Sequence, residues 1–114
     1  MSERQAKVGN LLKEHVATYV LHEANPNPMI TITRVDMSPD LKRAIVFFTT
    51  IPDGREEDAL IFLKRNGTDL RRYLKQKSLF KRIPHLDFMV DAGERHRQHI
   101  DEVMQQIEKQ KEGQ

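Results

Sequence analysis

A chain of 114 residues with 38% hydrophobic and 32% charged residues has the size and composition of one globular domain with a single core. It contains no Cys, which excludes disulfides, thiolate nucleophiles and thiol metal ligands. A net charge of +2 indicates no class of partner by itself. No run approaches membrane-spanning length and the start shows no signal pattern, so we expect a cytoplasmic protein.

The first predicted element is an amphipathic helix over residues 4–22, where apolar residues recur every three or four positions. Ser2 and Gln5 have the spacing of a capping box at its start. The helix should end before the prolines of residues 25–28, because proline lacks the N–H that a helix needs.

Two strands follow, Met29 to Met37 and Ala44 to Ile51, joined by the turn residues 38–40, which predicts an antiparallel hairpin. The apolar phase of the first strand shifts by one residue, which indicates a bulge near Thr33 and Arg34. The second strand is apolar on both faces: Ala44, Val46 and Phe48 on one, and Ile45, Phe47 and Ile51 on the other. We expect the helices to cover one face and another part of the same chain to cover the other.

Residues 58–77 predict a bent pair of helices, because their apolar residues keep one register past Gly67. Asp53 with Glu56 suits the start of this region, and acidic residues in a first turn favour the helix dipole. An alternative for Gly67 is a left-handed cap that simply ends the first helix.

A third strand is predicted over residues 86–90, with Leu86, Phe88 and Val90 facing the core, and a final helix follows from residue 93. We therefore divide the chain into a folded domain, 1–92, and a C-terminal helix with a frayed tail, 93–114. The element order predicts an α+β fold with helices on one face of a three-stranded sheet.

Basic residues are concentrated in residues 64–82, which hold eight Lys or Arg against Asp69 alone, whereas the segments on either side are mildly acidic. Such a patch is the electrostatic pattern of a nucleic-acid-binding protein. The five His residues have no metal-binding spacing, the closest pair being His96 and His99, and no nucleophile or nucleotide-binding motif occurs. We predict no enzymatic activity, no metal and no cofactor.

With the strands placed, the order resembles the type II KH-like fold. More narrowly, the chain resembles the bacterial ribosome-binding factor A family. The matching residues are residues 35–41, Ala44 and Val46, Gly67 with residues 70–74, residues 82–91, and the first helix with Arg4 and residues 7–8. One departure is Arg65, where the family has a small alanine two residues before the glycine.

The resemblance implies an assembly factor that binds the free small ribosomal subunit and its rRNA, beside nearby ribosomal proteins, late in maturation. It also implies support of precursor 5′-end rRNA processing and of growth in the cold. We expect a monomer when the protein is free. The predicted RNA-binding residues are Lys64, Arg65, Gly67, Arg71, Arg72, Lys75, Lys81 and Arg82. Few aromatics lie among them, so recognition should follow RNA shape and phosphates more than base stacking.

Two alternatives remain open on the sequence. One is a DNA-binding helix-turn-helix protein, although Leu63 is bulky where that motif takes a small residue. The other is a protein-interaction module that uses the face of Ile45 and Phe47.

Overall fold

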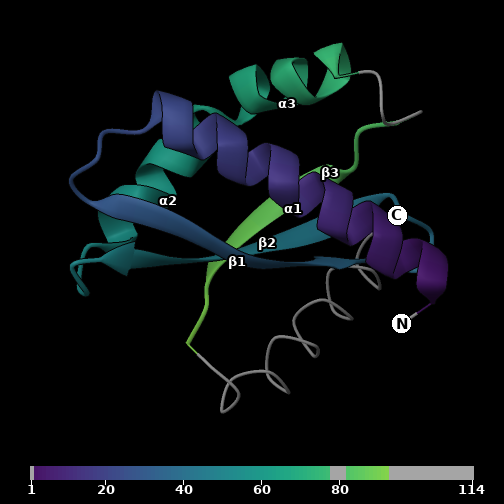
Figure 1. The fold of residues 1–114 in the computed structure, drawn as a ribbon, viewed down its shortest axis with the longest axis horizontal. Coiled ribbons are helices and arrows are strands. Elements are labelled where there is room, and N and C mark those ends of the chain that lie inside the picture. Colours follow the sequence, from purple (N-terminus) through teal and green to yellow (C-terminus); the bar gives the residue numbers. More distant parts are fainter. Residues whose placement is uncertain (1, 78–81, 93–114) are drawn as a thin grey trace, which may run out of the picture.

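A computed structural model describes residues 2–77 and 82–92. Its elements are α1 (Glu3–Glu23), β1 (Met29–Met37), β2 (Arg43–Ile51), α2 (Glu56–Arg65), α3 (Gly67–Gln76) and β3 (His85–Val90). All three helices lie on one side of the sheet (Figure 1). The predicted α+β layers and element order are confirmed, and the predicted C-terminal helix lies outside the described residues.

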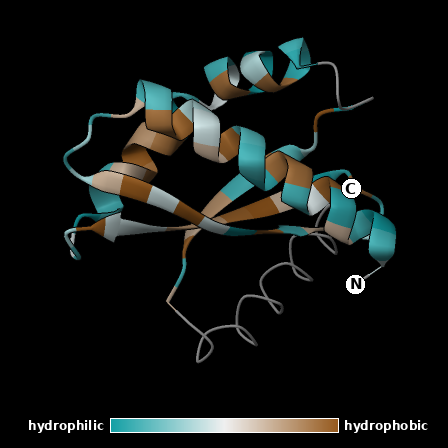
Figure 2. Cartoon of the chain, in the orientation of Figure 1, coloured by the Kyte–Doolittle hydropathy of each residue, from teal (hydrophilic) through white to brown (hydrophobic). Residues whose placement is uncertain are grey.

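Helix α1 begins at the predicted capping box. The Ser2 hydroxyl accepts the N–H of Gln5, and the Gln5 side chain accepts the N–H of Ser2, so two backbone donors at this end are satisfied reciprocally. The helix faces the sheet with its buried residues, including Leu12, Val16 and Val20. Figure 2 shows the apolar side of α1 turned toward the sheet and the polar side turned outward.

Strands β1 and β2 form the predicted antiparallel hairpin, and their register shifts between Ile32 and Arg34. The bulge is therefore where the change of apolar phase placed it. In the turn, Leu41 takes a left-handed φ of 61° and donates its N–H to the carbonyl of Ser38.

Strand β3 pairs with β2 in parallel, which gives the sheet order β1-β2-β3. Backbone hydrogen bonds hold both ends of β3, from His85 N–H to the Lys42 carbonyl and from Asp91 N–H to the Phe48 carbonyl. Leu86 and Phe88 pack against the main core as predicted. The prediction for Val90 was wrong: it is 37% exposed, because it ends an edge strand that is paired on one side only.

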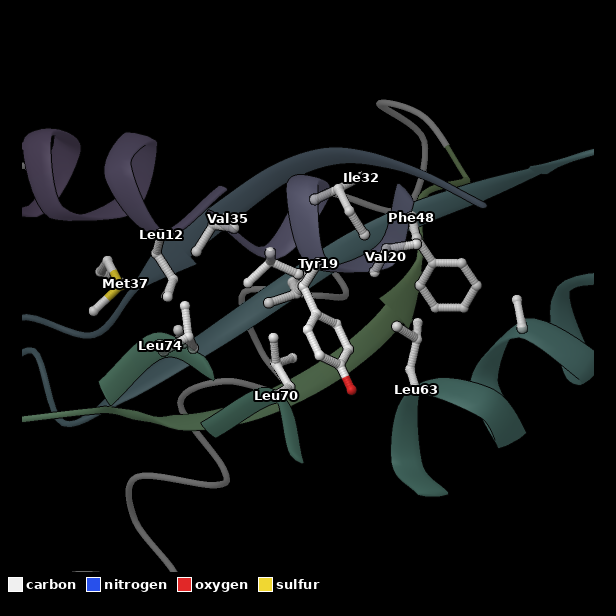
Figure 3. Close-up of a cluster of buried hydrophobic side chains, with 14 residues drawn as sticks. Leu12, Tyr19, Val20, Ile32, Val35, Met37, Phe48, Leu63, Leu70 and Leu74 are labelled. Atoms are coloured by element: carbon white, nitrogen blue, oxygen red, sulfur yellow. The ribbon is translucent and has the colours of Figure 1, made fainter. Parts of the chain in front are cut away.

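The main core lies between the helices and one face of the sheet (Figure 3). Ala44, Val46 and Phe48 of β2 meet apolar residues of all three helices there. The helix residues in this cluster include Leu12, Val16, Tyr19, Val20, Ala59, Leu63, Leu70 and Leu74. This packing fixes α2 and α3 against the sheet and leaves their polar residues outside.

The opposite face of β2 holds a smaller cluster. Ile45 and Phe47 are 1% and 0% exposed within the single chain, with Met89 packed beside them. The guanidinium of Arg34 lies 4.3 Å from the Phe47 ring centroid and forms an ion pair with Asp36. The expected intramolecular cover is confirmed for these residues. The expectation of such a cover was wrong for Ile51, which is 62% exposed at the end of β2.

The start of α2 differs from the prediction. Its N-cap residue is Arg55, which makes no side-chain capping bond, and not Asp53. The preceding turn uses Gly54 with φ of 90°, so the chain enters the helix two residues later than an Asp53 cap would require. Arg55 instead pairs with Asp58 at 2.9 Å across the first turn.

Candidate nucleic-acid interface

The predicted bent pair consists of two ten-residue helices joined by Asn66. Asn66 uses both its backbone N–H and its side-chain amide to donate to the Phe62 carbonyl, at 3.0 and 2.9 Å. Its own carbonyl accepts the N–H of Leu70 in the first turn of α3. One residue thus closes α2 and opens α3, which confirms the bend and assigns the junction to Asn66.

Gly67 is the first residue of α3, and its φ lies outside the left-handed region. The alternative of a left-handed cap is therefore wrong. A Cβ built on Gly67 would meet no atom within 4 Å. Neither backbone conformation nor packing in the described chain requires glycine here, so the position can accept the close approach of an outside molecule.

The outer arc of α3 is basic. Leu70 and Leu74 are buried against the core, and a step of 100° per residue puts Arg71, Arg72 and Lys75 on the side away from them. All three are exposed. We call these residues, together with Lys64 and Arg65 in the exposed last turn of α2 and Gly67, the α2–α3 surface.

Arg71 has a structural contact as well as a place on the α2–α3 surface. Its guanidinium donates to the Pro84 carbonyl at 2.8 Å and to the Ile83 carbonyl at 3.4 Å. This side chain therefore fastens α3 to the segment that leads into β3, and only part of its donor capacity faces outward.

The acidic residue of α3 is held on the flank that faces α1. The Tyr19 hydroxyl donates to Asp69 Oδ2 at 2.6 Å, and Arg72 lies 3.9 Å from Asp69 Oδ1. Burial first, and then the hydrogen bond and charge of Asp69, raise the pKa of Tyr19. Tyr19 also packs on Tyr73, with ring centroids 5.4 Å apart, and Lys77 lies over the Tyr73 ring at 4.8 Å. The Tyr19 hydrogen bond holds Asp69 on the flank next to α1, apart from the outer arc, whose residues are Arg71, Arg72 and Lys75.

Arg82 does not lie on the α2–α3 surface. It lines a groove at the end of the molecule where α1 begins, whereas the α2–α3 junction lies near the end of α1 (Figure 1). Lys81 and the His96–His99 pair lie outside the described residues. The structure therefore brings Lys64, Arg65, Gly67, Arg71, Arg72 and Lys75 together on one helix pair and separates Arg82 from them.

Among residues 2–77 and 82–92, no group of three or more His, Asp or Glu residues could hold a metal ion. No helix within these ranges is long and apolar enough to cross a membrane.

The helices on one face of a mixed three-stranded sheet, with the α2–α3 break at its side, define a KH-like α+β fold. The crystal structure of ribosome-binding factor A from Thermus thermophilus superposes with a TM-score of 0.66 at 24% identity, covering 75% of this chain and 94% of that one. The family model of ribosome-binding factor A matches residues 4–104. The chain belongs to the ribosome-binding factor A family.

Relatives in sequence and structure agree with this assignment. Ribosome-binding factor A of Chlorobium chlorochromatii is 31% identical over 112 residues, which cover 96% of this chain and 91% of the relative. That of Coxiella burnetii is 30% identical over 95 residues, covering 82% and 80%. A homology model of the Thermus thermophilus factor, fitted into a cryo-EM map of its complex with the 30S subunit, has a TM-score of 0.65 at 24% identity. The match covers 75% of this chain and 92% of that one.

Proposed function

We propose that this protein is a small-ribosomal-subunit assembly factor, which binds the free subunit through its rRNA and acts late in maturation. Its family membership and the 30S complex of the Thermus thermophilus relative support this proposal. By the same family likeness, we propose that it supports 5′-end processing of the precursor rRNA and growth in the cold, as a cytoplasmic monomer that meets ribosomal proteins near its site.

The observation that carries the proposal is the α2–α3 surface itself. It presents exposed cations on both helices around Gly67, a glycine that the fold does not need. Lys and Arg side chains bind backbone phosphates, and a missing Cβ lets a strand approach the helix start closely. Lys64, Arg65, Gly67, Arg71, Arg72 and Lys75 are the residues we propose to contact RNA here.

Sedimentation of purified small subunits with the protein tests the proposal. We expect Lys64→Gln with Lys75→Gln to weaken binding about ten-fold and to lower the salt dependence, as the slope of log K against log salt, by roughly 1.4 to 1.8 for two lost phosphate contacts. The control is Lys7→Gln with Lys13→Gln on α1, which removes the same charge from a different helix.

In cells that lack the protein, the wild-type gene should restore cold growth and mature 5′ ends, and the Lys64/Lys75 variant should do so only weakly. Equal binding by the double variant and the wild type would remove the α2–α3 surface from the mechanism. Stronger binding to duplex DNA than to small subunits would favour a DNA-binding protein instead.

A further inference from the structure

A groove of about 540 Å³ opens at the end of the molecule where α1 begins. Three segments distant in sequence line it: the start of α1, the turn between β1 and β2, and the residues that lead into β3. We call it the Arg82 groove, and its lining residues are Ser2, Arg4, Gln5, Val8, Pro39, Asp40, Leu41, Lys42, Arg82 and Pro84.

Hydrogen bonds fix the three walls of the Arg82 groove relative to one another. Gln5 Nε2 donates to the Met37 carbonyl at 3.1 Å, which joins α1 to the end of β1. The Lys42 carbonyl accepts the N–H of His85 at 2.8 Å, which joins the turn to β3. Arg71 of α3 donates to the Pro84 carbonyl and holds the third wall. The groove is therefore preformed, and a ligand need not order these segments when it binds.

The groove is electropositive. Arg4, Lys42 and Arg82 are exposed cations, and among the lining residues that the structure describes only Asp40 carries a carboxylate. That carboxylate has protein donors of its own, since Asp40 Oδ1 accepts from the Ser38 hydroxyl at 2.6 Å and from the Lys42 N–H at 3.0 Å. An anion that enters the groove meets three positive side chains from three different segments.

The lining also holds the polar Ser2 and Gln5 and an apolar part, in which Val8, Pro39 and Leu41 reach the surface while Pro84 is buried beneath. A surface that combines cations with apolar side chains matches a nucleotide, whose phosphate takes charge-assisted hydrogen bonds while its sugar and base offer weakly polar faces. An inorganic anion would use only the cations of such a groove.

We propose that the Arg82 groove binds a backbone phosphate of an RNA strand and packs the adjoining nucleoside on its apolar side chains. This proposal rests on the proposed function, since the RNA is that of the small subunit. Helix α1, with 21 residues, is roughly 30 Å long. The residues that line the groove include the start of α1, and the α2–α3 junction lies near its other end (Figure 1). The protein thus holds two separate parts of the subunit RNA at once, and each contact raises the effective concentration of the other.

Binding to purified small subunits compares two variants: Arg4→Gln/Lys42→Gln/Arg82→Gln, which removes the groove cations, and Lys64→Gln/Lys75→Gln, which changes the α2–α3 surface. The Lys7→Gln/Lys13→Gln protein is again the control. We expect the groove variant to bind at least ten-fold more weakly, with the salt slope lower by roughly 2 to 3 for three lost contacts. Lys42→Gln alone, which leaves the backbone bond to His85 in place, should show a smaller loss in the same direction and guards against misfolding of the triple variant.

The second arm places a photo-crosslinking residue at Lys42 and, separately, at Lys75. We expect both to crosslink to rRNA, and to different segments of it. If the groove variants kept the affinity and salt slope of the wild type while the α2–α3 variant lost affinity, the proposal that the Arg82 groove binds RNA would be refuted. The proposed function would still stand. If neither the groove variants nor the α2–α3 variant lost affinity, both the groove proposal and the proposed function would be refuted. Crosslinks from position 42 to a ribosomal protein alone would make the groove a protein contact and refute the RNA proposal.

Discussion

The α2–α3 surface and the Arg82 groove are both basic, but they are built differently. The first comes from one stretch, Lys64 to Lys75, and is carried on two short helices. The second combines Arg4, Lys42 and Arg82, which the fold brings together from three places in the chain. In the sequence, Glu3 and Asp40 lie close to two of these cations and hide them from a count of local charge. A basic surface therefore need not come from a basic stretch of sequence, and a surface built from distant residues is identified only from the fold.

The two regions meet at Arg71, which belongs to the α2–α3 surface and holds the segment that lines the groove. Of the single substitutions on the α2–α3 surface and its supports, Arg71→Ala should have the largest effect on stability. Loss of its hydrogen bonds to the Pro84 and Ile83 carbonyls should lower the free energy of unfolding by about 1 to 2 kcal/mol, measured by urea denaturation.

The matched control for Arg71→Ala is Arg72→Ala, one residue along, whose ion pair with Asp69 is exposed and 3.9 Å long. It should change stability by less than about 0.5 kcal/mol. In a double-mutant cycle for subunit binding, Arg71→Ala and Arg82→Ala should be non-additive, because both act on one wall of the groove. If Arg71→Ala and Arg72→Ala were equally stable, or if the effects of Arg71→Ala and Arg82→Ala on binding were simply additive, Arg71 would not couple the α2–α3 surface to the Arg82 groove.

A change at Tyr19 should act on the α2–α3 surface and leave the groove unaffected. Tyr19→Phe removes the 2.6 Å hydrogen bond to Asp69 and should cost about 1 kcal/mol of stability at pH 7. Since the fold raises the pKa of Tyr19, the neutral phenol is favoured in the native state. Its contribution is complete below pH about 10, the usual pKa of tyrosine, and is lost as the pH rises toward the higher native value.

Urea denaturation of wild type and Tyr19→Phe at pH 7 and at pH 11 measures this difference. The stability gap between the two proteins should narrow at the higher pH, because only the wild type has a phenol to ionise at this position. If the stability difference were the same at both pH values, the site of Tyr19 beside Asp69 would not favour the neutral phenol.

The smallest effect on stability is expected at Gly67. Its Cβ position is open and its φ is ordinary, so Gly67→Ala should leave the free energy of unfolding unchanged or raise it by about 0.5 kcal/mol. Binding to small subunits should fall nonetheless, if RNA approaches the start of α3 closely. A variant that is both stable and fully active would show that the α2–α3 surface works through its charges alone.

Much of this architecture follows from short-range patterns in the sequence. The capping box of Ser2 and Gln5, the bulge at Thr33 and the helix pair all depend on residues close together in the chain, and all were found. The boundaries of helices and strands were harder to predict. Asp53 looked like a helix cap, yet Gly54 turns the backbone so that α2 starts beyond it. Ile51 and Val90 alternate correctly and still reach solvent, because each ends its strand.

The sequence could group candidate site residues only where they are close together in the chain. The sequence grouped Arg82 with the helix cations by proximity, whereas the structure places Arg82 in the lining of the groove. It also treated Arg71 as an outward charge, because carbonyl partners twelve and thirteen residues away leave no trace in helical periodicity. Arg4 and Lys42 could have been found only by noticing that each lies in or beside a segment with strong family likeness.

Strand β2 lies at the centre of the sheet, with β1 on one side and β3 on the other, and its residues Ala44 to Phe48 are buried on both faces. The amides of this buried part are paired or covered, and we expect them to be the last in the described residues to exchange their hydrogens with water. The helices that carry the α2–α3 surface can loosen at lower cost. Local opening of these helices would therefore leave the central strand and the core packed on it in place.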